Sequence, residues 1–452
     1  MSGMCSQPGP SAVSGARPDH TQRVTFTYLI GVYLGVNAIR DLYMLIEGPD
    51  CTYMKTQYVQ GNHDWLSTLT SVSGLHRIAN TALHPSQMGE NRERGVKESL
   101  LRIASREAVP AVALTSMPMA FITGADYERL TRDVTKATGK PAIHIPGKSL
   151  SGDWLDGYAE VLHSLAAQLD LKGGTLDPKK VAVVGNLFDR NEEDCTGNVR
   201  ELRRTFEALG LELCSVWLSG GTFAELSALR DAGTIVSLPY GRRAAKRAAR
   251  RTGARLLELP LPFGLSATEE VVRTLGEAFD CRDKAQAFID AELSSIVPKL
   301  EWVIPFVFEN RGIGFIGEPH VLPGLVDIVE TLGARMRFAV LTNRTEHAAA
   351  LPSFGDRFEI LTYPRMREMS SFTSKVAGSG DMHLVVTHNE GATTGGAAML
   401  EFGFPSMFRH ALFDRPFLGF RGALSFIDLM ANALRMHEVE IARARMGNGG
   451  TS

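Results

Sequence analysis

Cysteine is scarce in this chain, which has five cysteines among 452 residues and no C-x-x-C pair. A small, odd and scattered set of cysteines argues against a disulfide-stapled secreted scaffold and suits a reducing compartment. The sequence also lacks any run of about 18 apolar residues, the length that a membrane-spanning helix needs. We therefore expect a cytoplasmic protein with no membrane partner.

Neither sign of charge dominates, because 48 Lys and Arg residues face 50 Asp and Glu residues and leave a net charge of −2. Without a basic excess, nucleic acid is not an expected partner. None of the Gly-rich loops that follow expected strands matches the dinucleotide pattern G-x-G-x-x-G, and no G-x-x-x-x-G-K-[ST] occurs. ATP binding by this chain itself is therefore not expected.

Short apolar segments alternate with helical patterns along most of the chain. The runs at 111–116, 181–185 and 338–343 are apolar and end in Ser, Gly or Asn, as strands of a buried sheet do. Strands separated by helices of about 10–15 residues predict parallel βαβ units. The chain is 44% hydrophobic, so it can bury more than one core of this kind.

The alternation recurs in three blocks and predicts an α/β protein with three Rossmann-like parallel-sheet domains. The expected divisions are a disordered tail at 1–22 and domains at 23–172, 173–295 and 296–452. Sites of open parallel sheets form at the carboxyl ends of strands, so the loops after the strands are the places to look for chemistry. Polar or Gly-rich loops of this kind occur at 45–55, 114–126, 385–396 and 409–422.

In the first of these loops, Cys51 follows Gly-Pro-Asp after an apolar strand. A thiolate in such a place can ligate iron, although a lone cysteine is more often a small buried hydrophobe. Ten residues on, the segment 61–65 contains His63 and Asp64, which are candidate ligands or proton donors. The alternative is a polar loop in which Asp64 caps a helix.

The loop at 385–396 follows another apolar strand and begins with His388, Asn389 and Glu390. Its glycines allow a ligand to approach the backbone, and a following helix would favour an anion such as a substrate carboxylate. A plain strand-to-helix turn explains the glycines equally well. Met117 and Met119 are candidates for lining an apolar substrate cavity, or for ordinary core packing.

Five segments, in this order and spacing, resemble component 1 of the nitrogenase superfamily, which includes dark-operative protochlorophyllide reductase and chlorophyllide reductase. The resemblance covers nearly the whole chain after the tail and implies three domains around a central cleft. The segments are EGPDC (47–51), LTSMPMAFITGADYERL (114–130), HIPGKSLSGDWLDGYAEVL (144–162), LPLPFGLSATEEVVRTL (259–275) and FDRPFLGFRGALSFIDLMANAL (413–434).

The resemblance implies an iron–sulfur cluster, of [4Fe–4S] type, at a subunit interface. Typical nitrogenase subunits supply three cysteines to their bridging cluster, and the corresponding positions here are Thr25, Cys51 and Met117. In dark-operative protochlorophyllide reductase one subunit gives a single Asp from this same loop, so Asp50 is the rival ligand. We favour Cys51 because a thiolate is the softer ligand.

The nitrogenase active-site cofactor also needs a Cys and a His. Cys195 lies in surroundings that do not match the family's cofactor Cys, and His410 lies close to the position of the cofactor His. Dinitrogen reduction is therefore not expected. The resemblance points to His63, His388 and His410 as proton donors, because histidine titrates near neutral pH. The substrate-binding candidates are Met117, Met119, Asn389 and Glu390.

The function that this resemblance implies is that of a subunit of a two-component reductase. It would accept electrons from an ATP-dependent iron–sulfur reductase protein and pass them through the cluster to a bound, tetrapyrrole-like substrate. Its second partner would be a paralogous subunit or another copy of itself. The alternative is a cofactor-assembly scaffold or a metal-free structural relative, since scaffolds of the superfamily keep the fold and lose ligands, as at Thr25 and Met117.

Overall fold

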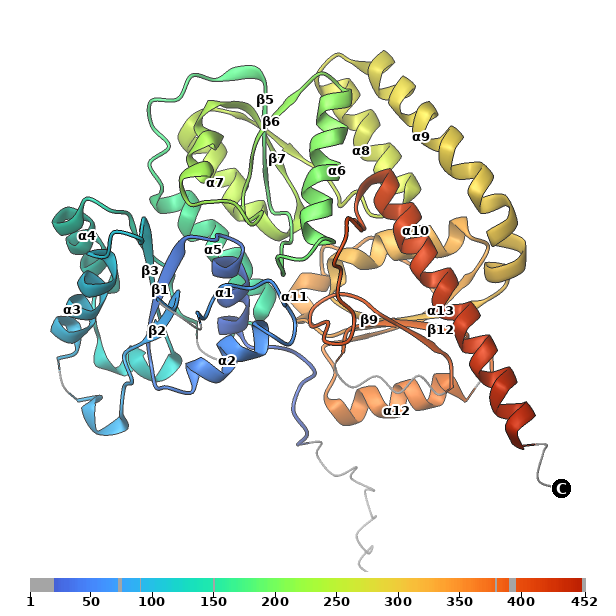
Figure 1. Cartoon of the computed structure of the whole chain (residues 1–452), viewed down its shortest axis with the longest axis horizontal. Helices are drawn as coiled ribbons and strands as arrows, with labels where there is room; N and C mark the ends of the chain where they lie inside the picture. Colours follow the sequence, from blue (N-terminus) through green and yellow to red (C-terminus); the bar gives the residue numbers. More distant parts are fainter. Residues whose placement is uncertain are drawn as a thin grey trace, which may run out of the picture.

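The computed structural model describes residues 20–71, 75–89, 91–148, 151–378, 380–389 and 396–448. They form three α/β domains, each built on one parallel sheet, so the predicted fold class is confirmed (Figure 1). The sheets span residues 42–144, 177–258 and 312–401. The boundaries between the domains stay a prediction, and most of the predicted tail lies outside the described residues.

Domain I has the sheet order β2-β1-β3-β4. Its strands are β1 (Leu42–Glu47), β2 (Ile78–Asn80), β3 (Ala111–Ser116) and β4 (Ala142–His144). Its helices and turns are α1 (Tyr28–Asn37), α2 (Thr52–Val59), η1 (Pro85–Gln87), α3 (Glu93–Ala104), η2 (Pro118–Thr123), α4 (Tyr127–Thr138) and α5 (Trp154–Gln168).

Helices α1 and α5 pack with their backbones in contact. A Cβ at Gly31 would lie 1.7 Å from the carbonyl oxygen of Trp154, and one at Gly157 would lie 2.0 Å from that of Tyr28. No other residue type fits at either crossing point, because such contacts lie far inside van der Waals distance. All ten residues of α1 are buried, as expected for a helix that is apolar on every side.

Domain II has the sheet order β6-β5-β7-β8. Its strands are β5 (Asp177–Val184), β6 (Glu212–Val216), β7 (Ala232–Ser237) and β8 (Arg255–Glu258). Its helices and turns are α6 (Cys195–Ala208), η3 (Ala224–Asp231), η4 (Pro239–Gly241), α7 (Arg242–Thr252) and α8 (Leu265–Ala278). The long α9 (Arg282–Val303) and the π-helical turn η5 (Ile304–Phe308) lead into domain III.

Domain III has the sheet order β11-β10-β9-β12-β13. Its strands are β9 (Gly312–Gly317), β10 (Arg335–Leu341), β11 (Glu359–Thr362), β12 (Leu384–Thr387) and β13 (Ala398–Glu401). Its helices and turns are η6 (Pro319–Val321), α10 (Leu322–Thr331), α11 (Thr345–Ala348), α12 (Met366–Ala377) and α13 (Gly419–Asn448). The last helix, red in Figure 1, also packs on α6 and α8 and so joins domains II and III.

Strand β9 itself has the spacing G-x-G-x-x-G, which in another context would indicate nucleotide binding. Here all six residues are buried within the sheet rather than in a loop. A Cβ at Gly314 would lie 2.4 Å from the ring of Phe338, so this glycine makes room for an aromatic side chain. No described helix is both long and apolar enough to cross a membrane.

An ionic contact joins domain I to domain III. The Nε2 atom of His347, in α11, lies 3.3 Å from Oδ1 of Asp153 and 3.6 Å from Oδ2 of Asp156, at the start of α5. Burial alone would lower the pKa of His347, but the two carboxylates outweigh it and raise the pKa to about 10. The imidazolium therefore holds the first turn of α5 against domain III at neutral pH.

We expect His347→Gln to lower the free energy of unfolding by on the order of 3 kcal/mol at pH 6. The unfolded ring releases its proton near pH 6.5, so the stabilisation is complete below that pH and is lost as the pH rises through about 10. Urea unfolding of both proteins at pH 6, 8 and 10 measures this, with the exposed His20→Gln as control. A difference that stays constant over this range would contradict the ionic contact.

Candidate functional site

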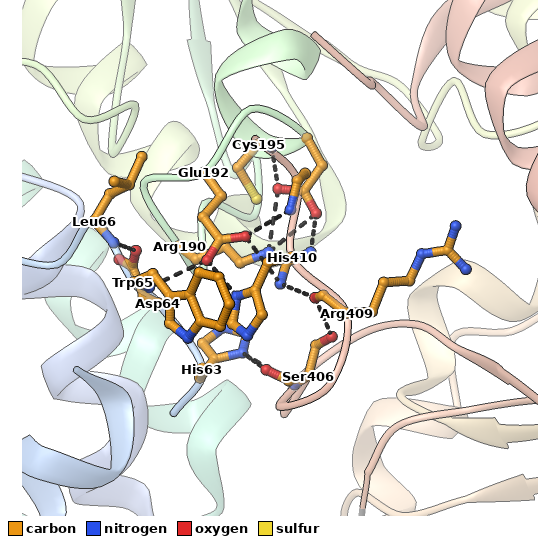
Figure 2. A network of polar contacts seen from close by, with 12 residues as sticks. His63, Asp64, Trp65, Leu66, Arg190, Glu192, Cys195, Ser406, Arg409 and His410 are labelled. Carbon is orange, nitrogen blue, oxygen red and sulfur yellow. Dashed lines mark hydrogen bonds and ion pairs between the residues drawn. The ribbon is translucent and has the colours of Figure 1, made fainter. Parts of the chain in front are cut away.

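The loop at 61–65 is the point where domain I meets the other two domains. Asp64 is fully buried and accepts a hydrogen bond from the backbone N of Leu66 at 2.9 Å (Figure 2). It also accepts from Asn37 Nδ2 at 2.7 Å and from the backbone N and Nδ2 of Asn191, each at 2.9 Å. It therefore links α1 of domain I to the loop after β5 of domain II. Asp64 is thus neither a ligand in an open site nor a helix cap.

The neighbouring His63 is fully buried and sits between a backbone donor and a carboxylate. Its Nδ1 accepts a hydrogen bond from the backbone N–H of Ser406 at 3.0 Å, and its Nε2 lies 3.5 Å from Oδ2 of Asp189. The Cys195 thiol donates to the other oxygen of Asp189 at 3.0 Å. His63 thus contacts residues of both other domains, which favours a positioning role over proton delivery to a substrate.

The charge states in this group follow from burial and from the neighbouring groups. Burial alone would raise the pKa of Asp189, but the His63 ring and the Arg190 guanidinium outweigh it and lower the pKa to about 2. Burial raises the pKa of the Cys195 thiol well above its usual value, so this sulfur keeps its proton. A protonated, fully buried thiol is a poor metal ligand, in line with the mismatch of its surroundings to the family's cofactor cysteine.

Another predicted proton donor, His410, lies against the loop at 61–65, where it contacts Trp65. Its Nδ1 lies 2.7 Å from Oε1 of Glu192 and its Nε2 lies 3.2 Å from the carbonyl oxygen of Met407. Both ring nitrogens therefore have a hydrogen-bonding neighbour. The Trp65 ring stacks on the imidazole at 3.6 Å between centroids and 18° between planes. Neither ring nitrogen of His410 is left for a metal.

A pocket opens between domains II and III, beside this junction. Its empty space, with the open mouth included, is about 920 Å³. Its walls come from the loops after β5 and β7, the carboxyl ends of β9 and β12, and the segment 400–417. Open parallel sheets bind ligands at this edge. Of the predicted proton donors, His388 and His410 line the pocket, and His63 is not among its lining residues.

Two side chains in this pocket, Glu318 and His388, have pKa values that burial shifts from their usual range. Burial raises the pKa of Glu318, which follows β9, to about 7, and its carboxyl accepts hydrogen bonds from Tyr240 Oη at 2.5 Å and from the backbone N of His320 at 2.7 Å. Burial lowers the pKa of His388 to about 4, so that this ring is neutral. A carboxyl poised near pH 7 in a pocket is a candidate acid.

None of the described residues that were predicted to bind substrate lines this pocket. Asn389 donates from Nδ2 to Glu401 at 3.0 Å and positions that carboxylate rather than lining the pocket. Met117 packs beside Gly48, where a Cβ would come within 2.8 Å of the Met117 Cγ, and Met119 is half-buried on η2. Neither methionine lines this pocket. Glu390 lies outside the described residues.

Cys51 is exposed at the start of α2 and lines a second, shallow pocket with Thr25 and Phe26. The hydroxyl of Thr25 is buried there without a hydrogen-bond partner. Met117 lies behind the same loop, so the three positions that correspond to the family's cluster cysteines do gather around 48–51. Asp50 is exposed beside Cys51 and does not line the pocket.

The described residues around Cys51 do not fit a cluster held by this chain alone. In the described part of the chain, no two further His, Cys, Asp or Glu side chains lie close enough to Cys51 to complete a metal site. The group that does have such spacing is Asp153, Asp156 and His347. Its histidine already faces both carboxylates as their counter-ion, so we assign it to the contact between domains.

The two pockets share an aromatic wall. Phe26 lines the Cys51 pocket and Phe404 lines the pocket between domains II and III. Their ring centroids are 5.2 Å apart at an interplanar angle of 70°, an edge-to-face contact. The Phe404 ring also packs edge-on against His63 at 4.8 Å. Two rings in contact therefore separate the exposed thiol's pocket from the enclosed one.

Sequence reasoning missed most of the polar residues of the enclosed pocket, among them Tyr240, Glu318, Arg409 and Arg415. A signal existed for Glu318, an acidic residue directly after a Gly-rich buried strand, and for the two arginines, which lie in the polar loop at 409–422. No signal marked Tyr240, because its role depends on a strand end in another domain.

We expect iodoacetamide to modify Cys51 in the native protein and to spare Cys195 until denaturant is added. Only Cys51 is exposed among the described cysteines, and burial keeps the Cys195 thiol protonated. Peptide mass spectrometry over a time course measures this in a Cys5→Ser background, with the half-buried Cys214 and Cys281 as internal references. Native labelling of Cys195 as fast as that of Cys51 would contradict the buried Cys195–Asp189 pair.

Comparisons with known proteins find nitrogenase-related proteins that are similar to this chain in sequence. The beta chain of the vanadium-iron nitrogenase of Trichormus variabilis is 22% identical over 393 residues, covering 79% of this chain and 83% of that protein. The iron-molybdenum cofactor biosynthesis protein NifN of a Nostoc species is 22% identical over 314 residues, covering 61% of this chain and 65% of that protein.

Among solved structures, one described as nitrogenase Cp1 at pH 6.5 superposes with a TM-score of 0.77 at 16% identity, covering 94% of this chain and 95% of that one. This likeness shows the fold. The model of the nitrogenase component 1 type oxidoreductase family matches residues 28–435, which is most of the chain. The protein therefore belongs to the nitrogenase component 1 type oxidoreductase family.

Proposed function

We propose that this chain is a subunit of a nitrogenase-like two-component reductase. In this proposal, an ATP-dependent iron–sulfur reductase protein delivers electrons to an iron–sulfur cluster at a subunit interface, to which Cys51 contributes one thiolate. The substrate occupies the pocket between domains II and III. Membership in a family of nitrogenase-type oxidoreductases supports a redox role.

The observation that carries this proposal is the contact between Phe26 and Phe404. It leaves two rings between the pocket of the exposed thiol and the enclosed pocket. A cluster bound at Cys51 would supply single-electron transfer. The role of this chain would be to keep that transfer short, because the rings are packed in contact and no solvent layer separates the two pockets there.

The protein's own residues would supply the proton. Glu318 lines the enclosed pocket, and burial places its pKa at about 7, so both its protonated and its ionised form are populated at neutral pH. The Tyr240 hydroxyl, 2.5 Å away, fixes the orientation of the carboxyl and stays neutral because burial and Glu318 raise its pKa. We therefore assign proton donation to Glu318. His388, whose ring is neutral, lies at the same edge of the sheet, after the neighbouring strand β12.

A cofactor-assembly scaffold is the second candidate. It is favoured by Thr25 and Met117 at positions where typical nitrogenase subunits have cluster cysteines, and by the similarity to a protein named for cofactor biosynthesis. The two functions differ in outcome. A reductase subunit turns over substrate with an ATP-driven electron donor, whereas a scaffold releases its cluster to an acceptor protein and turns over nothing.

We expect anaerobic co-purification with a paralogous subunit to give a complex that contains iron and acid-labile sulfide. In that complex, Cys51→Ala should remove or strongly alter the visible absorbance of the cluster without unfolding the chain, because the side chain is exposed. Cys281→Ala is the matched control, and Asp50→Ala shows whether the neighbouring carboxylate is a ligand. Full iron content and an unchanged spectrum in Cys51→Ala would overturn the ligand assignment, and a complex without iron would overturn the redox function.

We expect Glu318→Gln to be more stable than the unaltered protein at pH 8, by on the order of 3 kcal/mol, and about equally stable at pH 4.5. Because burial raises the pKa of Glu318, the favourable contribution of its neutral form is complete below the unfolded pKa and is lost as the pH rises through about 7. Gln keeps the neutral form at every pH. Thermal melts across this range measure the difference, with the exposed Glu440→Gln as control; an equal shift at both pH values would contradict the raised pKa.

A further inference from the structure

Helix α7 presents a row of cations on its exposed side. The helix packs on strands β7 and β8 of domain II and against α5 of domain I (Figure 1). Its packed side is built from four buried alanines, Ala244, Ala245, Ala248 and Ala249. Its opposite side consists of five exposed basic residues, which we call the α7 basic row: Arg243, Lys246, Arg247, Arg250 and Arg251.

Two arginines fix the ends of α7 in place through backbone carbonyls. Arg242, at the first position of the helix, donates from Nη2 to the carbonyl oxygen of Leu259 at 2.6 Å. Arg251, in the last turn, donates to the carbonyl oxygens of Ala166 at 2.7 Å and Leu169 at 2.8 Å, at the end of α5. A carbonyl oxygen has no net charge, so these contacts hold the helix without neutralising either guanidinium.

Two carboxylates pair with the α7 basic row. Lys246 Nζ lies 2.9 Å from Oε1 of Glu258, and Arg243 Nη1 lies 3.8 Å from Oε2 of Glu160. Lys148 Nζ, from the segment after β4, lies 3.6 Å from the same oxygen of Glu160. One of the two carboxylates is therefore shared with a further cation.

In the part of the chain that the structure describes, Arg247 and Arg250 have no carboxylate within ion-pair distance. Nη1 of Arg247 lies 3.5 Å from Nε2 of His163 on α5. Burial lowers the pKa of His163, and Arg243 and Arg247 lower it further against the opposing effect of Glu160. The ring therefore lies in a positive field even with Glu160 beside it.

The α7 basic row does not stabilise the helix that carries it. Arg243 and Arg247 are four residues apart, as are Lys246 and Arg250, and like charges at this spacing repel each other. Arg242 and Arg243 also lie in the first turn, where the helix dipole favours acidic residues, and α7 has none. Packing explains the alanines but not the row. An opposing anion would turn these repulsions into attractions.

The exposed side of α7 favours one kind of anionic partner. An amphipathic helix binds a membrane by burying its apolar side, and that side of α7 is already packed in the protein. The row has no aromatic side chain on which a base could stack, and the chain has a net charge of −2, so nucleic acid is disfavoured. Arg243, Arg247 and Arg250 follow one another at intervals of four and three residues, over a rise of roughly 10 Å. A partner helix with carboxylates at the same intervals has the same rise.

We propose that the α7 basic row docks an acidic helix of a partner protein, whose carboxylates, four and three residues apart, pair with Arg243, Arg247 and Arg250. Arginine suits the role, because its planar guanidinium donates two parallel hydrogen bonds to a carboxylate. This interaction goes beyond the proposed function. No residue of α7, all of which the structure describes, lines the enclosed pocket or the Cys51 pocket.

Fluorescence anisotropy with three labelled peptides tests the proposal. The matched peptide has three heptads of Glu-Ala-Ala-Ala-Glu-Ala-Ala, which repeat the spacing of four and three. The grouped peptide has the same composition with all its glutamates at one end, and the neutral peptide has Gln in place of every Glu. We expect the unaltered protein to bind the matched peptide about fivefold more tightly than the grouped one and about tenfold or more above the neutral one. Equal affinity for the matched peptide and either of the others would overturn the proposal.

The variants locate the docking surface. Arg247→Gln and Arg250→Gln should each weaken binding of the matched peptide by about threefold, and the double variant by about tenfold, as expected for exposed ion pairs. Arg94→Gln, which removes an exposed arginine from α3, is the matched control and should leave binding unchanged. Unchanged binding in the double variant would overturn the assignment.

Thermal melts show whether the row has a structural role instead. Arg250→Gln should melt at the same temperature as the unaltered protein or slightly higher, because it removes a repulsion with Lys246. Arg251→Gln should melt at a lower temperature, because it leaves two carbonyl oxygens of α5 without their donor. A loss in Arg250→Gln as large as that in Arg251→Gln would show that the fold itself needs the row, and would overturn the proposal.

Competition identifies the class of partner. Unlabelled matched peptide should displace the labelled one at a lower concentration of negative charge than duplex DNA or phosphatidylserine vesicles do. Displacement by DNA or by vesicles at the lower charge concentration would overturn the choice of an acidic protein. These titrations need neither iron nor an electron donor, so their outcome does not depend on the reductase function.

Discussion

Buried carboxylates must be hydrogen bonded, and in this protein that requirement holds the three domains together. Asp64, Asp189 and Glu192 are all buried, and no single domain supplies the donors they need. Glu192 alone accepts from the backbone N of Trp65 in domain I at 3.1 Å and from the backbone N of Ala411 in domain III at 2.8 Å. Each of these carboxylates therefore links at least two domains.

The same requirement explains where the enclosed pocket lies. Hydrogen bonds to Glu192 and Glu193 hold the segment 400–417 against domain II. This segment contains Phe404, Arg409 and Arg415, which line the pocket. The ring of Phe404 also contacts Phe26 of domain I. The polar junction thus positions an apolar wall and two cations in one pocket.

His63 and His410 show that residue type alone does not predict a side chain's role. Both were expected as proton donors because histidine titrates near neutral pH, and both lie at the junction in the structure. Each ring is committed to neighbours on both nitrogens, one between Ser406 and Asp189 and the other between Glu192 and Met407. Glu318, an ordinary acid in the sequence, acquires the pKa suited to the task because it is buried beside Tyr240.

The sequence by itself determined the fold class, since the periodicity of strands such as 111–116 and 338–343 is local and the chain's own β-branched and helix-forming residues set it. It also placed Cys51 in a loop after a strand, and the structure shows that this cysteine is exposed. Only the tertiary structure decided that Asp64 joins two domains, that Phe26 meets Phe404, and that Glu318 is buried beside Tyr240. The physical reason is that burial and pairing depend on residues hundreds of positions apart, and no local pattern records which distant group a side chain will contact.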